Sequence, residues 1–219
     1  MPMHTRNQRK YPGWGIAVGL LAGFVLWTVL LCLVDVQPIG PGASRVGFAS
    51  LNGLFHHLTG VNMTLYTITD WLGILPLAVV AGFGILGLVQ WIRRRSIRRV
   101  DRSLLVLGGF YLVVLAVFVL FEVLAINYRP ILINGVMEAS YPSSTTMLAM
   151  CVLPTAAFQL HDRIRHAALR TGVVSILWAL TIFMVVCRLL SGVHWLTDIL
   201  GGGLFGAGMV LGYRALTRE

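Results

Sequence analysis

Long apolar runs, separated by short polar segments, are the feature that most constrains how this 219-residue chain folds. A helix needs roughly 20 apolar residues to cross about 30 Å of hydrocarbon. Lipid offers the backbone no hydrogen-bond partner, so runs of this length form helices, and they lack the alternation of barrel strands. We therefore predict an all-α integral membrane protein, built as one domain over residues 1–219. Its six transmembrane helices are expected over roughly residues 14–34, 71–92, 104–126, 142–160, 171–187 and 195–213.

The composition excludes most soluble classes of protein. Hydrophobic residues make up 57% of the chain and charged residues 11%, whereas soluble domains carry about 25% charged residues. Too few polar side chains are present to cover a globule in water, so a cytosolic enzyme, a disordered chain and a nucleic-acid-binding domain are excluded. The three cysteines show no Cys-x-x-Cys spacing, so neither a disulfide framework nor a zinc site is indicated.

The basic residues are unevenly placed, and their distribution predicts the orientation in the membrane. Fourteen of the 17 Lys and Arg residues fall in the two terminal tails and in the second and fourth loops. Basic loops stay in the cytoplasm, so we expect a plasma-membrane protein with both termini cytoplasmic. The net charge of +9 then reflects topology and contact with anionic lipid rather than nucleic acid. The residues concerned are Arg6, Arg9, Lys10, Arg93, Arg94, Arg95, Arg98, Arg99, Arg102, Arg163, Arg165, Arg170, Arg214 and Arg218.

The connection between the first two spans is long and partly apolar. Val46, Phe48, Leu51, Leu54 and Phe55 recur in it at helical spacing. This pattern favours a short helix that lies in the membrane interface. An inert connecting loop is the alternative.

The remaining three basic residues, Arg45, Arg129 and Arg188, are predicted on the opposite, outward side of the membrane, and two of them follow predicted spans. Arg129 follows the third predicted span, and Arg188 follows the fifth. An ionisable residue beside the membrane marks a functional site by default, although a single outward arginine often serves only as an interfacial anchor. The planar guanidinium group matches the oxygens of a phosphate, so the pair of arginines favours an anion site.

The fourth predicted span opens with Pro142, Ser143, Ser144 and Thr145. Proline suits the first position of a helix, so we expect Pro142 to begin this one. The hydroxyls and free backbone N–H groups of the next three residues would then stand at a helix N-terminus, which attracts anions. Simple helix capping is the alternative.

A histidine and an aspartate follow Arg188. His194 and Asp198 are four residues apart, which predicts that they share one face of a helix. A carboxylate that holds one imidazole nitrogen leaves the other free as a nucleophile or base. Such a pair is often structural. Together with two arginines and a helix N-terminus on the same side of the membrane, it indicates phosphoryl transfer.

These motifs resemble those of the type 2 phosphatidic acid phosphatase superfamily, which includes membrane lipid phosphate and polyprenyl-diphosphate phosphatases. The family pattern is Lys-x6-Arg-Pro, Pro-Ser-Gly-His and Ser-Arg-x5-His-x3-Asp, and Arg188, His194 and Asp198 reproduce the spacing of the third element. The resemblance implies an outward-facing site where His194 forms a phosphohistidine and Asp198 orients it, with no metal or other cofactor. It also implies that the phosphoryl oxygens are held by Arg129, Arg188, Ser143 and the backbone N–H of Ser144.

The chain departs from the family pattern at three positions. Glu122 replaces the lysine of the first motif, Ser144-Thr145 replaces the Gly-His of the second, and Cys187 replaces the serine of the third. Glu122 would repel phosphate unless it is protonated or paired with one of the two outward arginines. Thr145 cannot supply the proton that the family's histidine gives to the leaving group.

The missing histidine favours a particular substrate. An alkoxide leaving group resembles hydroxide, a strong base that departs poorly without a proton, so it needs an acid worth about 10²–10⁴-fold in rate. A phosphate monoester, with a pKa of about 6, departs without a proton. We therefore expect a phosphatase or phosphotransferase acting on a lipid diphosphate such as undecaprenyl diphosphate. His56 or His57 in the outer connection is the alternative source of a proton.

A second hypothesis, from a different class, is a catalytically silent relative that binds phospholipid or polyprenyl phosphate as a carrier or partner protein. Glu122 and Thr145 favour this hypothesis, whereas the retained third motif favours the enzyme. Two further acidic residues are predicted on the outer side. Asp70, at the end of a span, is expected to be a solvent-facing cap, and Glu138, in the loop before Pro142, either faces solvent or reaches the site. The sequence predicts neither the acceptor of the phosphoryl group nor the oligomeric state.

Overall fold

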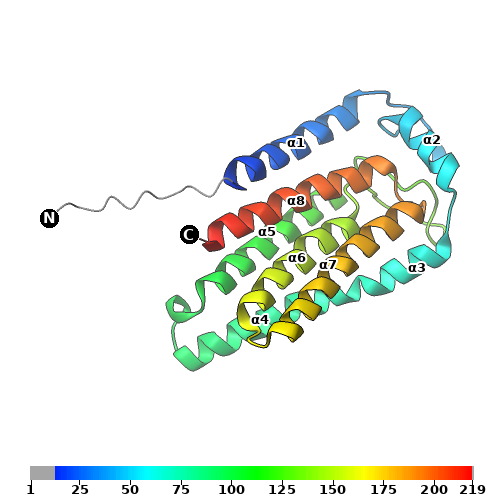
Figure 1. Ribbon diagram of the computed structural model, residues 1–219. Coiled ribbons are helices and arrows are strands. Elements are labelled where there is room, and N and C mark those ends of the chain that lie inside the picture. Colours follow the sequence, from blue (N-terminus) through cyan, green and yellow to red (C-terminus); the bar gives the residue numbers. More distant parts are fainter. Residues whose placement is uncertain (1–12, 219) are drawn as a thin grey trace.

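The computed structural model describes residues 13–218, and these form a bundle of α-helices without a β-strand (Figure 1). The predicted all-α class is therefore confirmed. In the bundle, α1 packs along α8, and α6 packs against both α7 and α8. The helices are α1 (Gly13–Leu33), α2 (Ala49–Thr59), α3 (Met63–Leu72), α4 (Ile74–Arg94), α5 (Arg102–Leu124), α6 (Ser144–Arg163), α7 (Ala167–Leu190) and α8 (Leu196–Arg218), with short 3₁₀ turns at Pro41–Ala43 and Ile97–Arg99.

Five helical stretches in the described part of the chain are long and apolar enough to cross a membrane. They are α1, the stretch Met63–Arg94 that joins α3 to α4, α5, α7 and α8. The predicted count of six is not reached by this measure, because α6 is not among them. The reason lies in the surroundings of α6, which packs against α4, α5, α7 and α8 and buries most of its residues. A helix enclosed by protein does not need lipid-facing apolar side chains.

Several predicted helix boundaries are corrected by the structure. The second span does not begin at residue 71, because helix already forms at Met63 and continues through Gly73 into α4. The fifth is longer than residues 171–187. Pro142 does not open the fourth helix: Ser143 is the N-cap residue and α6 begins at Ser144. The hydroxyl of Ser143 accepts the orphan N–H of the first turn, a role that proline cannot fill.

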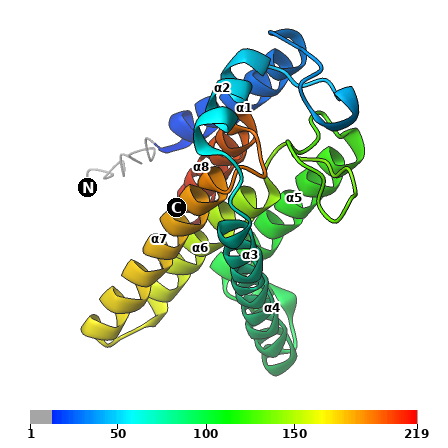
Figure 2. The same cartoon turned by 90° about the vertical axis from the view of Figure 1, so that its right-hand side faces the viewer.

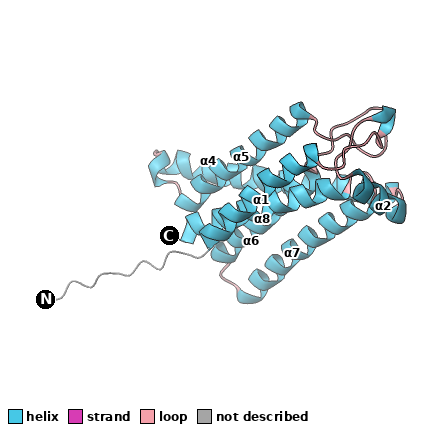
Figure 3. Ribbon diagram, turned by 90° about the horizontal axis from the view of Figure 1, so that it is seen from above, coloured by secondary structure: helices cyan, strands magenta, loops and turns pink. Residues whose placement is uncertain are grey.

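The connections between helices separate into two ends of the bundle (Figure 1). One end, the motif end, carries the loops 34–48, 125–143 and 191–195, which Figures 2 and 3 show gathered together. The other, the basic end, carries the loops 95–101 and 164–166 and the C-terminal end of α8. The arginines that predicted a cytoplasmic side all lie at the basic end, as far as the structure describes them. Arg6, Arg9 and Lys10, which also entered that prediction, lie outside the described residues.

The apolar segment between the first two spans does contain a helix, α2. Asp35 accepts a hydrogen bond from the backbone N–H of Ser50 at 2.7 Å, in the first turn of α2, and this bond lowers the pKa of Asp35. The buried side chain of Asn52 bonds the hydroxyl of Thr197 at 2.9 Å and accepts from the Thr197 N–H at 3.2 Å. These contacts fasten α2 to the first turn of α8, at the motif end.

Small residues let Tyr141 enter the core beside α8. A methyl group on Gly201 would lie 2.5 Å from the Tyr141 ring, and one on Gly206 would lie 2.5 Å from Met150. The glycines of α8 therefore allow close helix packing at these positions. The Tyr141 hydroxyl hydrogen-bonds Thr28 Oγ1 at 2.7 Å. The segment that leads into α6 is thereby anchored to α1 and α8.

Candidate functional site

His194 lies in the short loop between α7 and α8 and is 2% exposed. The predicted shared helical face with Asp198 is wrong, because α8 begins only at Leu196. The two side chains still meet, with 3.7 Å between His194 Nδ1 and Asp198 Oδ2, a contact longer than a hydrogen bond. Asp198 Oδ2 accepts the N–H of Trp195 at 2.9 Å, and its Oδ1 accepts from Asn127 Nδ2 at 3.2 Å. Asp198 is thus oriented by two donors in a fully buried position.

Arg129 approaches the other imidazole nitrogen. Its Nη1 lies 3.4 Å from His194 Nε2, and its Nε lies 2.9 Å from Glu138 Oε2. The backbone N–H of Arg129 also donates to the Glu138 carbonyl at 3.1 Å. Arg129 is 8% exposed. The loop 125–143 therefore places a buried cation against the nitrogen that would act as a nucleophile.

Arg188 lies in the last turn of α7 and is 1% exposed. All of its side-chain partners come from α3. Its Nη1 donates to Thr69 Oγ1 at 3.2 Å, its guanidinium stands 4.7 Å from the ring centre of Tyr66, and Nη2 is 4.0 Å from Asp70 Oδ1. Asp70, expected only to face solvent, therefore also balances the charge of Arg188.

The two arginines and burial act together on His194. Burial lowers the pKa of His194 well below its ordinary value, and the charges of Arg129 and Arg188 lower it further, against a smaller opposing effect of the Ser140 backbone. A lowered pKa means that the imidazole is neutral at pH 7. The neutral ring keeps a lone pair, which nucleophilic attack requires.

The start of α6 adjoins the same cluster. The backbone N–H of Ser143 donates to the Asp198 carbonyl at 3.1 Å, which fastens the N-terminus of α6 to the first turn of α8. Ser143 is fully buried, and its hydroxyl lies 3.5 Å from the Thr146 N–H that it caps. Ser144 and Thr145 follow in the first turn, so the predicted helix N-terminus and the His194–Asp198 pair are brought together.

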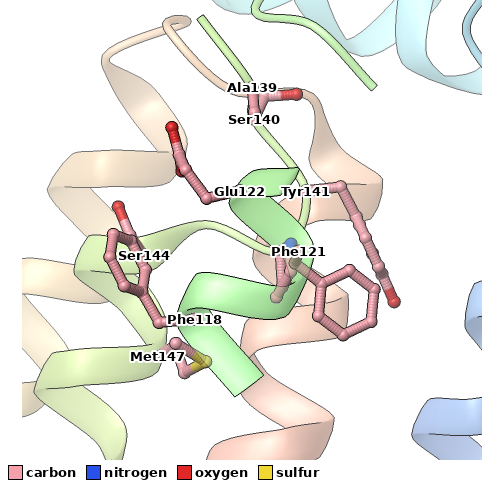
Figure 4. Close-up of a pocket in the computed structure, with 9 residues that line it drawn as sticks. Phe118, Phe121, Glu122, Ala139, Ser140, Tyr141, Ser144 and Met147 are labelled. Carbon is pink, nitrogen blue, oxygen red and sulfur yellow. The ribbon is translucent and has the colours of Figure 1, made fainter. Parts of the chain in front are cut away.

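Glu122 stands apart from the arginines. It lines a small pocket between α5 and α6 at the motif end, with Phe118, Phe121, Ser144 and Met147 (Figure 4). Among residues 13–218 it forms no ion pair, so the pairing with Arg129 or Arg188 that the sequence left open is not observed. The two arginines use other carboxylates, and the charge of Glu122 is left exposed beside the start of α6.

Buried polar atoms without a hydrogen-bond partner gather around this cluster. Within the described part of the chain they include Arg129 Nε, Arg188 Nε and His194 Nδ1, and the hydroxyls of Ser140 and Thr146. Such atoms are rare in folded proteins, because each one costs free energy. Their concentration here indicates a place prepared for a polar ligand. The ligand would be an anion, since two of the atoms belong to guanidinium groups.

Several residues of the cluster are not predicted from sequence. Asn127 carries only the weak signal of lying in the same loop as Arg129, and for Glu138 the sequence leaves open whether it reaches the site or faces solvent. Tyr66 and Thr69 carry none, because they belong to a segment predicted to be a connection. His56 bonds the Gly192 carbonyl at 3.1 Å and packs on the Trp195 ring at 5.6 Å, which supports the loop before His194.

The residues described offer no obvious metal site. His, Cys, Asp and Glu side chains in the range 13–218 nowhere gather in a group of three that could hold a metal ion. Arginines, a histidine and a helix N-terminus are donors suited to a phosphate group rather than ligands for a cation. Independence from metals stays a prediction.

The fold and this cluster define an integral membrane protein with buried arginine, histidine and aspartate side chains at one end of a helical bundle. Residues 124–219 match the model of the PAP2 superfamily. They contain the positions of all three motifs except that of Glu122. The resemblance drawn from the motifs is therefore confirmed over residues 124–219, which match the PAP2 superfamily.

A solved structure shares the fold over nearly the whole chain. It is the crystal structure of a transmembrane PAP2-type phosphatidylglycerolphosphate phosphatase from Bacillus subtilis, with 22% sequence identity and a TM-score of 0.57. The match covers 91% of this chain and 93% of the phosphatase. No curated protein matches the sequence.

Proposed function

We propose that this protein is a metal-independent membrane phosphatase or phosphotransferase that cleaves a lipid diphosphate, such as undecaprenyl diphosphate, through a phosphohistidine at His194. The observation that carries the proposal is the contact between Arg129 Nη1 and His194 Nε2 at 3.4 Å. It places a buried cation at the lone pair of a neutral imidazole. A phosphoryl group drawn to that cation would arrive within reach of the nucleophile.

The proposed first step is binding of the terminal phosphoryl group. Arg129 and Arg188 would donate to its oxygens, and so would the N-terminus of α6 at Ser143 and Ser144. Both arginines have a buried Nε without a hydrogen-bond partner among the described residues, although that of Arg129 is ion-paired with Glu138, so both guanidinium groups keep hydrogen-bonding capacity for a ligand. Charge-assisted bonds of this kind are about twice as strong as neutral ones.

The proposed second step is an in-line attack on phosphorus. His194 Nε2 forms the N–P bond while the bond to the bridging oxygen breaks, and the lipid phosphate departs with the electron pair. The departing monoester has a pKa of about 6, so it needs no proton from the position of Thr145. The positive charge that develops on the imidazole is stabilised by Asp198, whose Oδ2 lies 3.7 Å from Nδ1. Water or another acceptor then takes the phosphoryl group, which restores His194.

The proposed setting is a single membrane domain, with the motif end facing outward and both termini in the cytoplasm. The arginines at the basic end support this orientation. We also propose that α6 is a sixth span, because its 20 residues cover about 30 Å and it runs between the same two ends as its neighbours. The amphipathic α2, at the motif end, would lie in the outer interface of the plasma membrane.

The competing function is a catalytically silent carrier or partner that binds phospholipid or polyprenyl phosphate. Two observations favour it: the exposed charge of Glu122 beside the start of α6, and the threonine at position 145. Neither touches the contact between Arg129 and His194. Binding without turnover would be the mark of this alternative.

The test is phosphate release by the purified protein in detergent, with a chelator present. Undecaprenyl diphosphate and phosphatidic acid are compared, with His194→Ala as the matched control. Release from the diphosphate that the substitution abolishes is the expected result. No release from either lipid, together with binding of polyprenyl phosphate, would support the silent carrier instead.

A further inference from the structure

The guanidinium group of Arg129 is held between two partners, a nitrogen and a carboxylate. Nη1 faces His194 Nε2 at 3.4 Å, and Nε lies 2.9 Å from Glu138 Oε2. Glu138 also accepts the Arg129 backbone N–H through its carbonyl, at 3.1 Å. Glu138 is thus joined to Arg129 twice, once through its backbone and once through its side chain.

Neither side-chain contact is tightly made. The Nε–H group does not point at the carboxylate, so Arg129 Nε lacks a hydrogen bond despite the short distance. The contact with His194 is long for a hydrogen bond, which ordinarily measures about 2.7–3.2 Å. In this arrangement the lone pair of His194 Nε2 is covered by an Arg129 N–H. Attack on phosphorus requires that N–H to move away.

We propose that Glu138 is a positioning residue that tethers Arg129 while its Nη1 passes from His194 Nε2 to a phosphoryl oxygen. This rests on the proposed function of His194 as the nucleophile. The carboxylate keeps the Nε side of the guanidinium in place. The Nη1 side therefore moves only a short distance, and the cation stays beside the nucleophile. Its negative charge also weakens the attraction of the site for an anion, which helps phosphate to leave.

A purely structural role for the carboxylate is disfavoured by the backbone of the same loop. The carbonyl of Glu138 accepts from Arg129 whatever its side chain, and Ser140 N–H donates to the Asn127 carbonyl at 2.8 Å. An isolated bridge pairs Tyr128 with Ala139. These bonds hold the two halves of the loop together without the carboxylate, so its contribution falls on the guanidinium group.

The two effects of Glu138 act in opposite directions, which makes them separable. Glu138→Gln keeps the shape of the side chain and removes the charge. We expect it to tighten binding of inorganic phosphate about 3- to 10-fold, since one repulsive charge is lost. We expect it to lower kcat about 10-fold or more, because a misplaced catalytic group is costly. Glu138→Asp keeps the charge and shortens the tether, so kcat falls while phosphate affinity stays within about 2-fold.

The experiment measures equilibrium binding of inorganic phosphate together with kcat and KM for the diphosphate, on full-length protein in detergent. Asp162→Asn is the matched control, because this carboxylate is at the basic end and its side chain is 79% exposed. Tighter phosphate binding combined with a lower kcat in Glu138→Gln is the expected result. Unchanged values, or losses of both affinity and kcat, would overturn the role of Glu138.

Failure of the proposed function has a different signature. Wild-type protein that binds phosphate but turns over no lipid would contradict the enzyme alone, and the binding comparison would still test the charge of Glu138. Wild-type protein that binds no phosphate would overturn both the anion site and the tether.

Discussion

Some charged side chains pair with one another at the basic end of the bundle, whereas at the motif end several are buried without all of their hydrogen bonds. Asp101 accepts from Gln90 Nε2 at 2.8 Å, pairs with Arg94 at 2.9 Å and lies 3.5 Å from Arg163. These groups come from α4, from the start of α5 and from α6, so the network ties three helices together. The buried exception in the described part of this end is Arg214 Nε, whose guanidinium stacks on an aromatic ring instead.

At the motif end the charges are buried and incompletely satisfied. Arg129, Arg188 and His194 are each less than 10% exposed, and each keeps a nitrogen without a hydrogen-bond partner within residues 13–218. A network that served only stability would not leave buried donors unpaired, because each costs about 1–3 kcal/mol. From this difference we infer that the charges at the basic end hold helices together, whereas those at the motif end are available to bind a ligand. Substitutions at the two ends should therefore separate stability from activity.

The largest effect is expected for His194→Ala. Loss of the nucleophile should lower turnover per folded molecule by about 10³-fold or more. The thermal midpoint should also fall somewhat, because the ring removed is buried and contacts Arg129. Arg163→Ala at the basic end should give a lower midpoint with unchanged turnover per folded molecule. Thermal unfolding and phosphate release on the same samples make the comparison. Turnover by His194→Ala within about 10-fold of wild type would contradict the proposed nucleophile.

Arg188→Lys should come next. A lysine keeps the charge but loses the planar fork that matches phosphate and stacks on Tyr66. We expect kcat/KM to fall about 10²-fold, as misplacement of a positioning group typically costs. Arg94→Lys makes the same change at the basic end and should leave kcat/KM unaltered. Equal effects of the two substitutions would remove the distinction between the two ends.

Thr145→His should have an intermediate and selective effect. It restores an acid at the position where the family pattern has one, so monoester hydrolysis should rise about 10-fold or more while diphosphate hydrolysis changes little. Rates for phosphatidic acid and undecaprenyl diphosphate are measured on wild type and variant. An equal change for both substrates would contradict the explanation based on the leaving group.

The smallest effect is expected for Asp101→Asn, at the basic end. Hydrogen bonding from Gln90, with smaller contributions from Arg94 and Arg163, holds the pKa of Asp101 below its ordinary value. The ionised carboxylate therefore adds stability above its unfolded pKa, about 3.9, and this stability is lost as pH falls through the lower folded pKa. The contribution is at most about 1 kcal/mol, because the group is partly exposed. Between pH 5 and pH 3 the thermal midpoint should fall faster for wild type than for the variant. Parallel curves would contradict a stabilising contribution of the ionised Asp101 carboxylate.

The sequence predicts the helices better than the contacts between them. Long apolar runs locate α1, α5, α7 and α8 to within a few residues, because crossing lipid imposes a length and a composition. The same signal is weak for α6, because neighbouring helices surround it. It does not predict α3, where Tyr66 and Thr69 are polar residues that contact Arg188. Helices whose side chains pack against protein need not show the long apolar run that marks a lipid-facing helix.

The candidate site follows the same division. Arg129, Arg188, His194 and Asp198 are found from motif spacing, because their chemistry fixes their residue types. For Glu138 the sequence leaves two possibilities open, since a carboxylate in a loop has the same appearance whether it faces solvent or pairs with an arginine such as Arg129. The sequence also fails to predict that His194 lies in a loop. Its four-residue spacing from Asp198 predicts one helix for both residues, but α8 begins only at Leu196.

The most direct measurement is the trapping of a phosphoryl group on the protein. Lipid diphosphate labelled in its terminal phosphate is mixed with purified protein and quenched in alkali, where phosphohistidine survives and phosphoesters of serine do not. Label on the peptide that contains His194, absent from His194→Ala and reduced in Arg129→Ala, is the predicted result. Phosphate release by wild type with no label at His194, or with label on another residue, would contradict the phosphohistidine mechanism.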